Sequence, residues 1–512
     1  MCGIAGFCNF KEDFEENTDY WNFRLEKMRA VLAHRGNDAR GRFLKKHIGL
    51  SHSRLAIRDI LCGDQPMTRT HNGYDYTICY NGEIYNTDEL IPELSENGFV
   101  CSTTSDTEVI LYAYIHWGAD FVNRLNGIFA FAIWDAAKNR LLLYRDRVGV
   151  KPLFYAIRGD SLVFGSEPKA CFAHPAVKPE LDKQGLQELL AIGPAHTSGL
   201  SLFKDLFEVL PGHFMIYSQN GLHDETYWEL TSREHTESYQ DTVAHTRFLV
   251  EDAIKRQMVS DVPVCTFLSG GIDSSIVTAI AANYMNTRGK TLNTFSFDFK
   301  DNDRYFKANA FQPERDLPYV NRMLEEYETA HSYLECDENS LFKALFAAVD
   351  AKDMPGMTDV DSSLLYFCSL VSQKNKVALT GECADEIFGG YPWFYRKELL
   401  ERYGFPWSSD VAPRLALLRD DVGLELDLSG YQAFRYEESR SKAPLLYGEA
   451  GEDESRRIIG YLNIKWFMQT LLDRMDRTSM YSELEARVPF ADHRIIAVSY
   501  THLRAHETDQ YL

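Results

Sequence analysis

The sequence predicts an α+β N-terminal domain built on antiparallel sheets and an α/β C-terminal domain with a parallel sheet and additional helices. A chain of 512 residues is too long for one ordinary hydrophobic core. Short strand-like runs dominate residues 1–218, whereas strands and helices alternate after residue 235. The polar segment Thr231–Asp241 between them is typical of a linker. We therefore predict one domain over residues 1–218 and a second over residues 235–512.

Turn signals such as Asn72-Gly73 separate the strand-like runs of the first region. The runs are Ile48–Ile57, Tyr74–Tyr80, Ile128–Trp134, Arg140–Tyr144 and Ser161–Phe164. Helical patterns interrupt them at Tyr20–Leu32 and Ser105–Trp117. Runs of strands with few helices are typical of an α+β domain.

In the second region an amphipathic helix precedes a buried strand, a glycine-rich turn, a second helix and a second strand. We expect these four elements at Thr242–Met258, Val264–Leu268, Ser274–Tyr284 and Thr291–Phe297. Such alternation predicts a parallel sheet covered on both faces. From about Tyr395 onward helical patterns dominate.

The composition restricts the class of partner. A formal net charge of −21 argues against a nucleic-acid-binding surface, because phosphate backbones attract basic faces. No apolar run reaches membrane-spanning length, and the first residues lack a secretory signal. Ten cysteines without a C-x-x-C pair are typical of reduced thiols. We therefore predict a cytoplasmic protein with small-molecule substrates, no nucleic-acid or membrane partner, and a homodimer as a candidate assembly.

Cys2 directly follows the initiator methionine. Methionine is normally trimmed before a small residue, which would give Cys2 both a thiol and a free α-amine. An α-amine titrates at about 7.7–8.0, so it can take the thiol proton and leave a thiolate that attacks a carboxamide. Position alone favours a chance cysteine, so the prediction depends on the surrounding residues.

A thiol amidase needs an oxyanion hole and groups that hold the charged ends of its substrate. The Asn81 side-chain amide and the Gly82 N–H can form the oxyanion hole. Arg54 can bind an α-carboxylate and Asp106 an α-ammonium. Asp106 also has a purely structural explanation, because the pattern Ser105-x-x-Glu108 is a helix capping box.

These segments resemble the class II, or N-terminal-nucleophile, glutamine amidotransferases over about two hundred residues. The matching motifs are MCGIAGF, HRG at His34–Gly36, YNGEIYN, SDTEV, LNGIFAFAIWD and RDRVGVKPLFY. The resemblance implies an Ntn-hydrolase type of fold with two stacked sheets, Cys2 as the nucleophile, and Asn81 and Gly82 as catalytic oxyanion groups. It also implies glutamine-binding residues: Arg54, Leu55, Ala56, Ile57, Arg58, Asn81, Gly82, Glu83 and Asp106. Asn37 departs from the family, which usually has proline there.

A second candidate site begins at the glycine-rich string Phe267–Ser275, between a strand and a helix. Its small residues let backbone N–H groups wrap a phosphate, and a helix N-terminus favours an anion. The string lacks the ending of a Walker A loop. It resembles the pyrophosphate loop of enzymes that cleave ATP between the α and β phosphates.

Clustered carboxylates follow the strand-like run Val377–Leu379. Mg²⁺ prefers a few carboxylates with phosphates and water, although acids at a helix start are often simply solvated. The string Thr380–Tyr391 resembles the second ATP motif of asparagine synthetases, which implies magnesium-binding Asp273 and Asp385 and a catalytic Glu382 that acts in acyl-adenylate formation. The implied ATP-binding residues are Leu268, Ser269, Gly270, Gly271, Asp273, Ser274, Phe297, Thr380 and Gly381. Thr380 and Cys383 replace the usual serine and glycine.

The strings Leu472–Arg477 and Leu484–Phe490 also resemble the synthetases and are expected between the two sites. The resemblance ends near Arg494, so we expect a truncated or altered end after about residue 494. The resemblance implies that Cys2 hydrolyses glutamine and that MgATP activates aspartate as β-aspartyl-AMP, which ammonia converts to asparagine. Two alternatives stay open: a related amidotransferase acting on another carboxylate, and a synthesis-defective glutaminase or binding protein.

Overall fold

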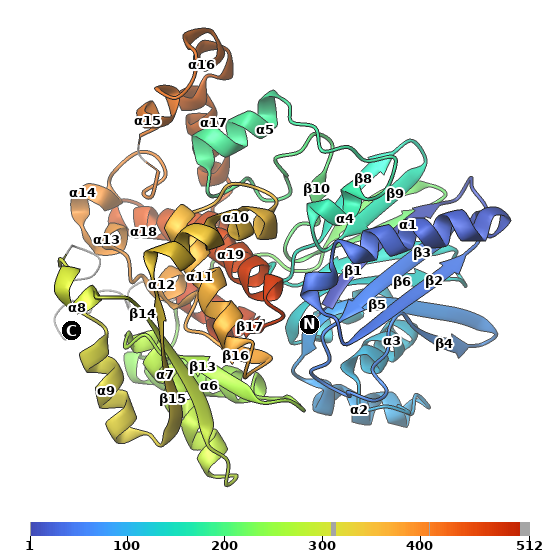
Figure 1. The fold of residues 1–512 in the computed structure, drawn as a ribbon, viewed down its shortest axis with the longest axis horizontal. Helices are drawn as coiled ribbons and strands as arrows, with labels where there is room; N and C mark the ends of the chain where they lie inside the picture. Colours follow the sequence, from blue (N-terminus) through green and yellow to red (C-terminus); the bar gives the residue numbers. More distant parts are fainter. Residues whose placement is uncertain (1, 309–313, 409, 502–512) are drawn as a thin grey trace.

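The computed structural model describes residues 2–308, 314–408 and 410–501. Two six-stranded antiparallel sheets form the N-terminal half, and a five-stranded parallel sheet with helices forms the C-terminal half. Figure 1 shows the two halves side by side, with the start of the chain near their junction. The predicted fold class is confirmed. The predicted domain limits stay a prediction, and the expected change after residue 494 lies largely outside the described residues.

β1 (Cys2–Asn9) lies inside the first sheet, between β3 (Ile48–Arg54) and β9 (Ser161–Gly165). Side chains alternate along a strand, so Ile4 and Cys8 face the second sheet, whereas Ala5 and Phe7 face the helices outside. The strand order is β10-β8-β9-β1-β3-β2. The other elements here are β2 (Ala39–Lys45), β8 (Phe154–Arg158), β10 (Phe207–Glu208), α1 (Thr18–Ala30) and α4 (Pro168–Phe172).

β5 (Tyr74–Ile84) lies inside the second sheet, whose order is β12-β11-β7-β6-β5-β4. Tyr80 and Ile84 pack under helices, whereas Cys79 belongs to the core between the two sheets. The same alternation turns Asn81 toward the first sheet and therefore toward Cys2. The other elements are β4 (Met67–His71), β6 (Gly127–Asp135), β7 (Arg140–Arg145), β11 (His213–Ser218), β12 (Gly221–Thr226), α2 (Thr87–Glu96) and α3 (Asp106–Trp117).

Two local expectations differ from the structure. The sequence analysis did not place α2, whose interior Pro92 is a residue that usually interrupts helices. The capping box before α3 is only half formed: the Ser105 side chain accepts from the Thr107 N–H, but Glu108 accepts from Ser102 and Thr103 instead of reaching back. The strand expected to reach Ile57 ends at Arg54, which leaves the next residues free to line a site.

The parallel sheet has the order β15-β14-β13-β16-β17. On β13, Val264 packs with α7, whereas Cys265 packs with α11 on the opposite face. Helices thus cover both faces, as the alternation of strands and helices predicts. The elements are β13 (Val264–Phe267), β14 (Leu292–Phe299), β15 (Thr329–Cys336), β16 (Val377–Leu379), β17 (Glu485–Arg487), α6 (Tyr239–Arg256), α7 (Ile272–Asn286), α9 (Leu317–Glu326), α10 (Glu338–Lys352) and α11 (Thr358–Val371).

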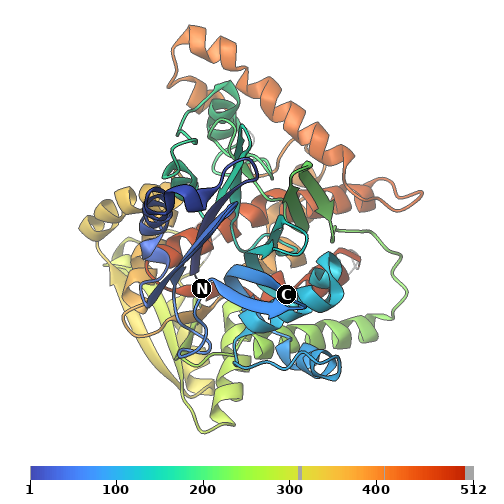
Figure 2. The ribbon, with the colours of Figure 1, turned by 90° about the vertical axis from the view of Figure 1, so that its right-hand side faces the viewer.

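Shorter helices and a helical subdomain complete the C-terminal half. Ala191 and Ile192, from the N-terminal half, pack with several of these helices in one hydrophobic cluster. The segment between β12 and α6 runs along the outside of the molecule (Figure 2). The remaining helices are α5 (Lys183–Gln187), α8 (Asn302–Tyr305), α12 (Ala384–Phe388), α13 (Pro392–Tyr395), α14 (Lys397–Leu400), α15 (Ala412–Leu415), α16 (Asp420–Leu426), α17 (Leu428–Ser441), α18 (Glu452–Leu462), α19 (Met468–Tyr481) and α20 (His493–Thr501).

Within the described ranges, no helix combines the length and the apolar character needed to cross a bilayer.

Candidate active sites

Cys2 begins β1 and is buried beside the start of the loop that follows β3. Cys2 is the strand partner of Arg54, and its backbone N–H donates to Asn81 Oδ1 at 2.9 Å. Burial raises the pKa of the Cys2 thiol, and nearby positive charge and the Leu55 N–H offset this only in part. A thiol in this position needs a base next to it to form a thiolate near neutral pH.

Asn81 offers an oxyanion donor. Its Nδ2 is buried and has no hydrogen-bond partner among the described residues, although its Oδ1 is held by Cys2. A buried unpaired N–H₂ is costly, so such a group indicates a site where a ligand oxygen is bound. Gly82 next to it must remain glycine, because a Cβ there would lie 2.1 Å from the Ile128 carbonyl oxygen.

Arg54 already binds a carboxylate. Its Nη1 lies 3.0 Å from Asp64 Oδ1, and its Nη2 donates to the Asp59 carbonyl at 2.5 Å. The Asp64 side chain is 77% exposed, whereas that of Arg54 is 6% exposed. A substrate α-carboxylate can therefore replace the exposed Asp64 carboxylate on a guanidinium that is buried and held by other partners.

The residues after Arg54 line the same corner through their backbone. The Ala56 N–H donates to Asp38, and the Ile57 carbonyl accepts from the Asp261 N–H of the C-terminal half. Arg58 donates to Thr87 and to the end of β5. The segment is therefore clamped between the two sheets and the C-terminal half.

Two acids close the opposite side of this corner. Asp106 Oδ2 accepts from the Tyr80 hydroxyl at 2.9 Å and from the Ile84 N–H at 3.0 Å. Burial and the neighbouring Asp106 raise the pKa of Glu83 well above its usual range, and Arg487 offsets this only in part. Glu83 Oε2 also lacks a partner among the described residues. An ammonium group placed between the two acids would relieve their repulsion.

The second site lies where two neighbouring strands of the parallel sheet end. β13 and β16 lie side by side, and their following segments leave the sheet at the same edge. The strand order changes direction here, with β14 on one side of β13 and β16 on the other, and such points hold ligands in open α/β sheets. A cavity of about 390 Å³ opens between the two loops.

The lining of this cavity contains most of the predicted ATP-binding residues. Those that line it are Leu268, Ser269, Gly271, Asp273, Ser274, Phe297, Thr380 and Gly381, and the predicted catalytic Glu382 lines it too. Gly270 does not line it; it has φ +85°, and a Cβ there would lie 2.8 Å from the Asp316 carbonyl oxygen. The loops touch directly, since a Cβ on Gly381 would lie 2.8 Å from the Ser274 nitrogen. The small residues therefore serve close backbone approach.

Carboxylates gather at the mouth of the cavity. Burial, Asp385 and Glu382 together raise the pKa of Asp273 to about 7. Partial desolvation and Glu382 also raise the pKa of Asp385, which lies at the more exposed edge. Acids that repel one another in this way suit a bound cation. Among the residues that the structure describes, no group of three or more potential ligands forms a ready-made metal site, so phosphate oxygens would have to complete one.

Glu382 is held by a residue that the sequence analysis did not assign to the site. Arg474 on α19 donates to Glu382 Oε1 at 2.7 Å, and its Nε has no partner among the described residues. Arg474 also lines the cavity, as do Val360 and Ser363 of α11. The arginine lies in the string Leu472–Arg477, which was expected between the two sites without a specific role.

Both halves match known families. Residues 1–228 match the glutamine amidotransferase domain family, and residues 245–505 match the asparagine synthase family. Asparagine synthetase [glutamine-hydrolyzing] 3 of Bacillus subtilis (strain 168) is 48% identical over 497 residues, which cover 97% of this chain and 80% of that protein. The chain belongs to the glutamine-hydrolysing asparagine synthetase family.

Other similarities are more distant. Asparagine synthetase [glutamine-hydrolyzing] 1 of the same organism is 30% identical over 536 residues, covering 98% of this chain and 80% of that protein. The solved glutamine phosphoribosylpyrophosphate amidotransferase of B. subtilis, complexed with ADP and GMP, is 16% identical, with a TM-score of 0.35 over 65% of this chain and 81% of that one. That score is too low to bear on the function of this family member.

The oxyanion role predicts a specific kinetic defect. Asn81→Asp keeps an oxygen that can accept from the Cys2 N–H but removes the unpaired Nδ2 donor. We expect kcat for glutamine hydrolysis to fall about 10²–10³-fold, the usual effect of losing one oxyanion donor. Steady-state glutamate release measures it, and ammonia-dependent pyrophosphate release should stay unchanged. A variant with wild-type kcat would exclude Asn81 from the oxyanion hole.

The acid cluster predicts that MgATP binding depends on pH. Because the pKa of Asp273 is about 7 in the free protein, this acid is protonated below pH 7 and binds a cation poorly there. We expect the affinity for MgATP to rise between pH 6 and 8, and Asp273→Asn to weaken binding and flatten this dependence. Calorimetric titration at several pH values measures it. Asp303→Asn, an exposed acid outside the cavity, is the control and should follow the wild type.

Proposed function

We propose that the chain makes asparagine from aspartate, with glutamine as the nitrogen donor and ATP as the activating nucleotide. Trimming of Met1 converts the Cys2 nitrogen to an α-amine, which takes the thiol proton as Sγ attacks the glutamine carboxamide carbon. Asn81 Nδ2 and the Gly82 N–H hold the resulting oxyanion. The protonated amine then gives its proton to the departing ammonia, and water hydrolyses the thioester to glutamate.

Substrate recognition at this site follows from the charges around it. Arg54 takes the glutamine α-carboxylate in place of Asp64, and Asp106 takes the α-ammonium. Glu83 stands beside Asp106, and an ammonium bound between the two would favour the charged form of Glu83. The backbone of residues 55–58 lines the rest of the corner.

At the second site the aspartate side-chain carboxylate attacks the α-phosphorus of ATP, giving β-aspartyl-AMP and pyrophosphate. Ser269, Gly271 and Ser274 present hydroxyl and backbone groups to the phosphates. Asp273 and Asp385 fit Mg²⁺, which when bound would neutralise phosphate charge. Glu382, which Arg474 holds, acts in this acyl-adenylate formation. Ammonia then attacks the acyl carbon, AMP leaves with the bonding electrons, and the excess proton passes to solvent.

This proposal rests on the match of both halves to the two families. It also rests on the 48% identity of the whole chain to a glutamine-hydrolysing asparagine synthetase. The burial of Cys2 against Asn81 supports the glutaminase half, and the cavity beside Asp273 supports the synthetase half. A cytoplasmic location and a homodimer stay predictions. The first rests on ten unpaired cysteines, which suit a reducing compartment.

Pyrophosphate release tests the proposal directly. With MgATP and either glutamine or ammonia, we expect pyrophosphate and asparagine with aspartate but not with glutamate. Pyrophosphate formed with a different carboxylate would instead indicate a related amidotransferase. Glutamate formed from glutamine without any pyrophosphate would indicate a protein that hydrolyses glutamine alone.

Replacing the nucleophile should separate the two reactions. Cys2→Ala removes the thiol, so we expect glutamine-dependent synthesis to fall below detection and ammonia-dependent synthesis to remain. Intact-mass measurement of the wild type should also show that Met1 is absent. Equal loss of both activities in Cys2→Ala, in a preparation with wild-type thermal stability, would contradict two separable sites.

A further inference from the structure

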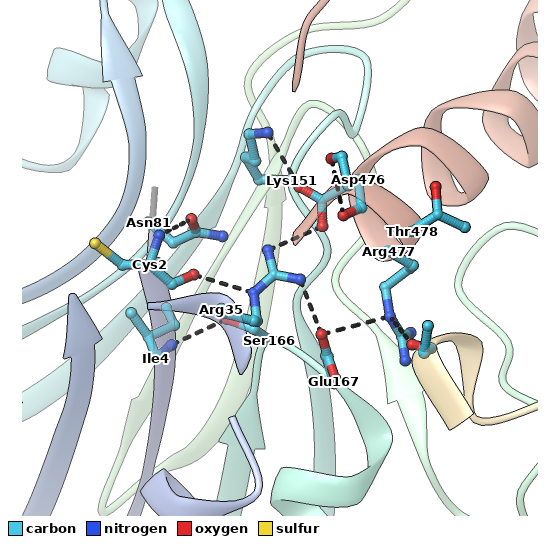
Figure 3. A network of polar contacts seen from close by, with 12 residues as sticks. Cys2, Ile4, Arg35, Asn81, Lys151, Ser166, Glu167, Asp476, Arg477 and Thr478 are labelled. Atoms are coloured by element: carbon cyan, nitrogen blue, oxygen red, sulfur yellow. Dashed lines mark hydrogen bonds and ion pairs between the residues drawn. The ribbon is translucent and has the colours of Figure 1, made fainter. Parts of the chain in front are cut away.

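A buried ion cluster joins the glutaminase nucleophile to the synthetase half (Figure 3). Arg35 donates from Nε to the Cys2 carbonyl at 3.1 Å, and from Nη2 to Asp476 Oδ2 on α19 at 2.9 Å. Its Nη1 lies 2.9 Å from Glu167 Oε1. One planar guanidinium therefore contacts the backbone of the nucleophile and a helix that begins more than 460 residues later in the chain.

The cluster contains three cations and two acids, and it is almost fully enclosed. Lys151 Nζ lies 3.0 Å from Asp476 Oδ1, and Arg477 Nε lies 3.6 Å from Glu167 Oε1. The side chains of Arg35, Lys151 and Arg477 are 0% exposed. Burial alone would raise the pKa of Asp476, yet Arg35 and Lys151 hold it below its usual range. Buried charges of this kind tolerate little change in geometry, because each depends on its partners for compensation.

The other side of α19 reaches the second site. Arg474, two residues before Asp476, donates to Glu382 and lines the cavity of the synthetase half. Residues two apart on an α-helix point about 200° apart, so these side chains leave opposite sides of the helix. One side of α19 thus contacts Glu382, and the opposite side contacts Arg35, which binds the Cys2 carbonyl.

We propose that Arg35 and Asp476 are positioning residues that couple glutamine hydrolysis at Cys2 to occupancy of the aspartate–ATP site. Substrates that bind Glu382 alter its ion pair with Arg474 and thereby shift the position of α19. Asp476 moves with α19 and displaces Arg35. Because Arg35 holds the Cys2 carbonyl, this displacement changes the orientation of the Cys2 thiol. Because packed helices shift as rigid elements, a small displacement of α19 reaches Cys2 with little loss. This inference rests on the proposed function.

The first test measures the response of glutamine hydrolysis to the second site. In the wild type we expect aspartate plus MgATP to raise kcat/KM for glutamate release at least about fivefold, the lower end of usual coupling between two sites. Asp476→Asn keeps the shape but not the charge, and we expect it to reduce the response below about twofold. A wild type that makes asparagine without any such response, or an Asp476→Asn variant that keeps it, would overturn the proposal.

Glu89→Gln is the matched control. Glu89 forms another ion pair between the two halves, with Arg256 at 2.6 Å, outside the Arg35 cluster, so this variant should keep the wild-type response. Ammonia-dependent pyrophosphate release in the same preparations shows that the synthetase half is folded. If Asp476→Asn loses ammonia-dependent pyrophosphate release, the double variant Asp476→Asn, Lys151→Met, which removes one acid and one cation, replaces it. We expect the same response, below about twofold, from the double variant. A wild type without ammonia-dependent pyrophosphate release would contradict the proposed function instead.

A reciprocal measurement excludes a merely structural effect. Cys2→Ala binds glutamine without hydrolysing it, and an ATP analogue that cannot be cleaved between the α and β phosphates binds with aspartate without forming β-aspartyl-AMP. Linkage requires glutamine to tighten the binding of this pair by the same factor by which the pair tightens glutamine binding. We expect Asp476→Asn in this background to remove both effects while each ligand still binds alone. Equal tightening with and without Asp476→Asn would contradict coupling through this pair.

Discussion

The guanidinium of Arg35 is the contact on which the arrangement of the two sites depends. It replaces water with three fixed partners: the Cys2 carbonyl, Glu167 and Asp476. The N-terminal half buries Arg35 and Lys151 with Glu167, so without Asp476 of the other half one of these cations would lack a compensating charge in a low-dielectric interior. The two halves are therefore matched to each other at a point where the nucleophile is anchored. β17 adds a second connection, since Arg487 lies 3.8 Å from Glu83.

Strand geometry explains why each site lies at the junction. Side-chain alternation places Asn81 of one sheet opposite Cys2 of the other, so the proposed nucleophile and its proposed oxyanion donor come from separate sheets that stack. In the second half, parallel strands end at one edge, which brings together loops that are about 110 residues apart in sequence. The residues of each site are therefore brought together by a whole sheet. α19 lies between the two sites, with Arg474 toward Glu382 and Asp476 toward Arg35.

Much of this architecture follows from the sequence. The rhythm of strand-like and helical runs predicted the two kinds of sheet, and the strands and helices expected around Ser269 agree with the structure within a few residues. The strand that begins at Cys2 was not among the predicted runs. α2 was missed because Pro92 breaks its helical pattern, and Arg474 was not assigned because alternating acids and arginines on a helix usually form surface ion pairs. Contacts such as Arg35 with Asp476 pair opposite charges from distant segments, and no local pattern encodes such a pairing.

The departures from the family pattern also have structural consequences. Cys383 stands where glycine is usual and has φ 78°, a left-handed conformation that costs a side-chain-bearing residue roughly 1–2 kcal/mol. Its thiol is 1% exposed and packs in the core beside Ala384 and Ile387, so apolar burial offsets part of that cost. Asn37, in place of proline, donates to Glu483 Oε1 of the C-terminal half at 2.5 Å, a bond that proline lacks the side chain to make. One substitution therefore adds apolar packing beside the cavity of the C-terminal half, and the other adds a polar contact across the junction that α19 also spans.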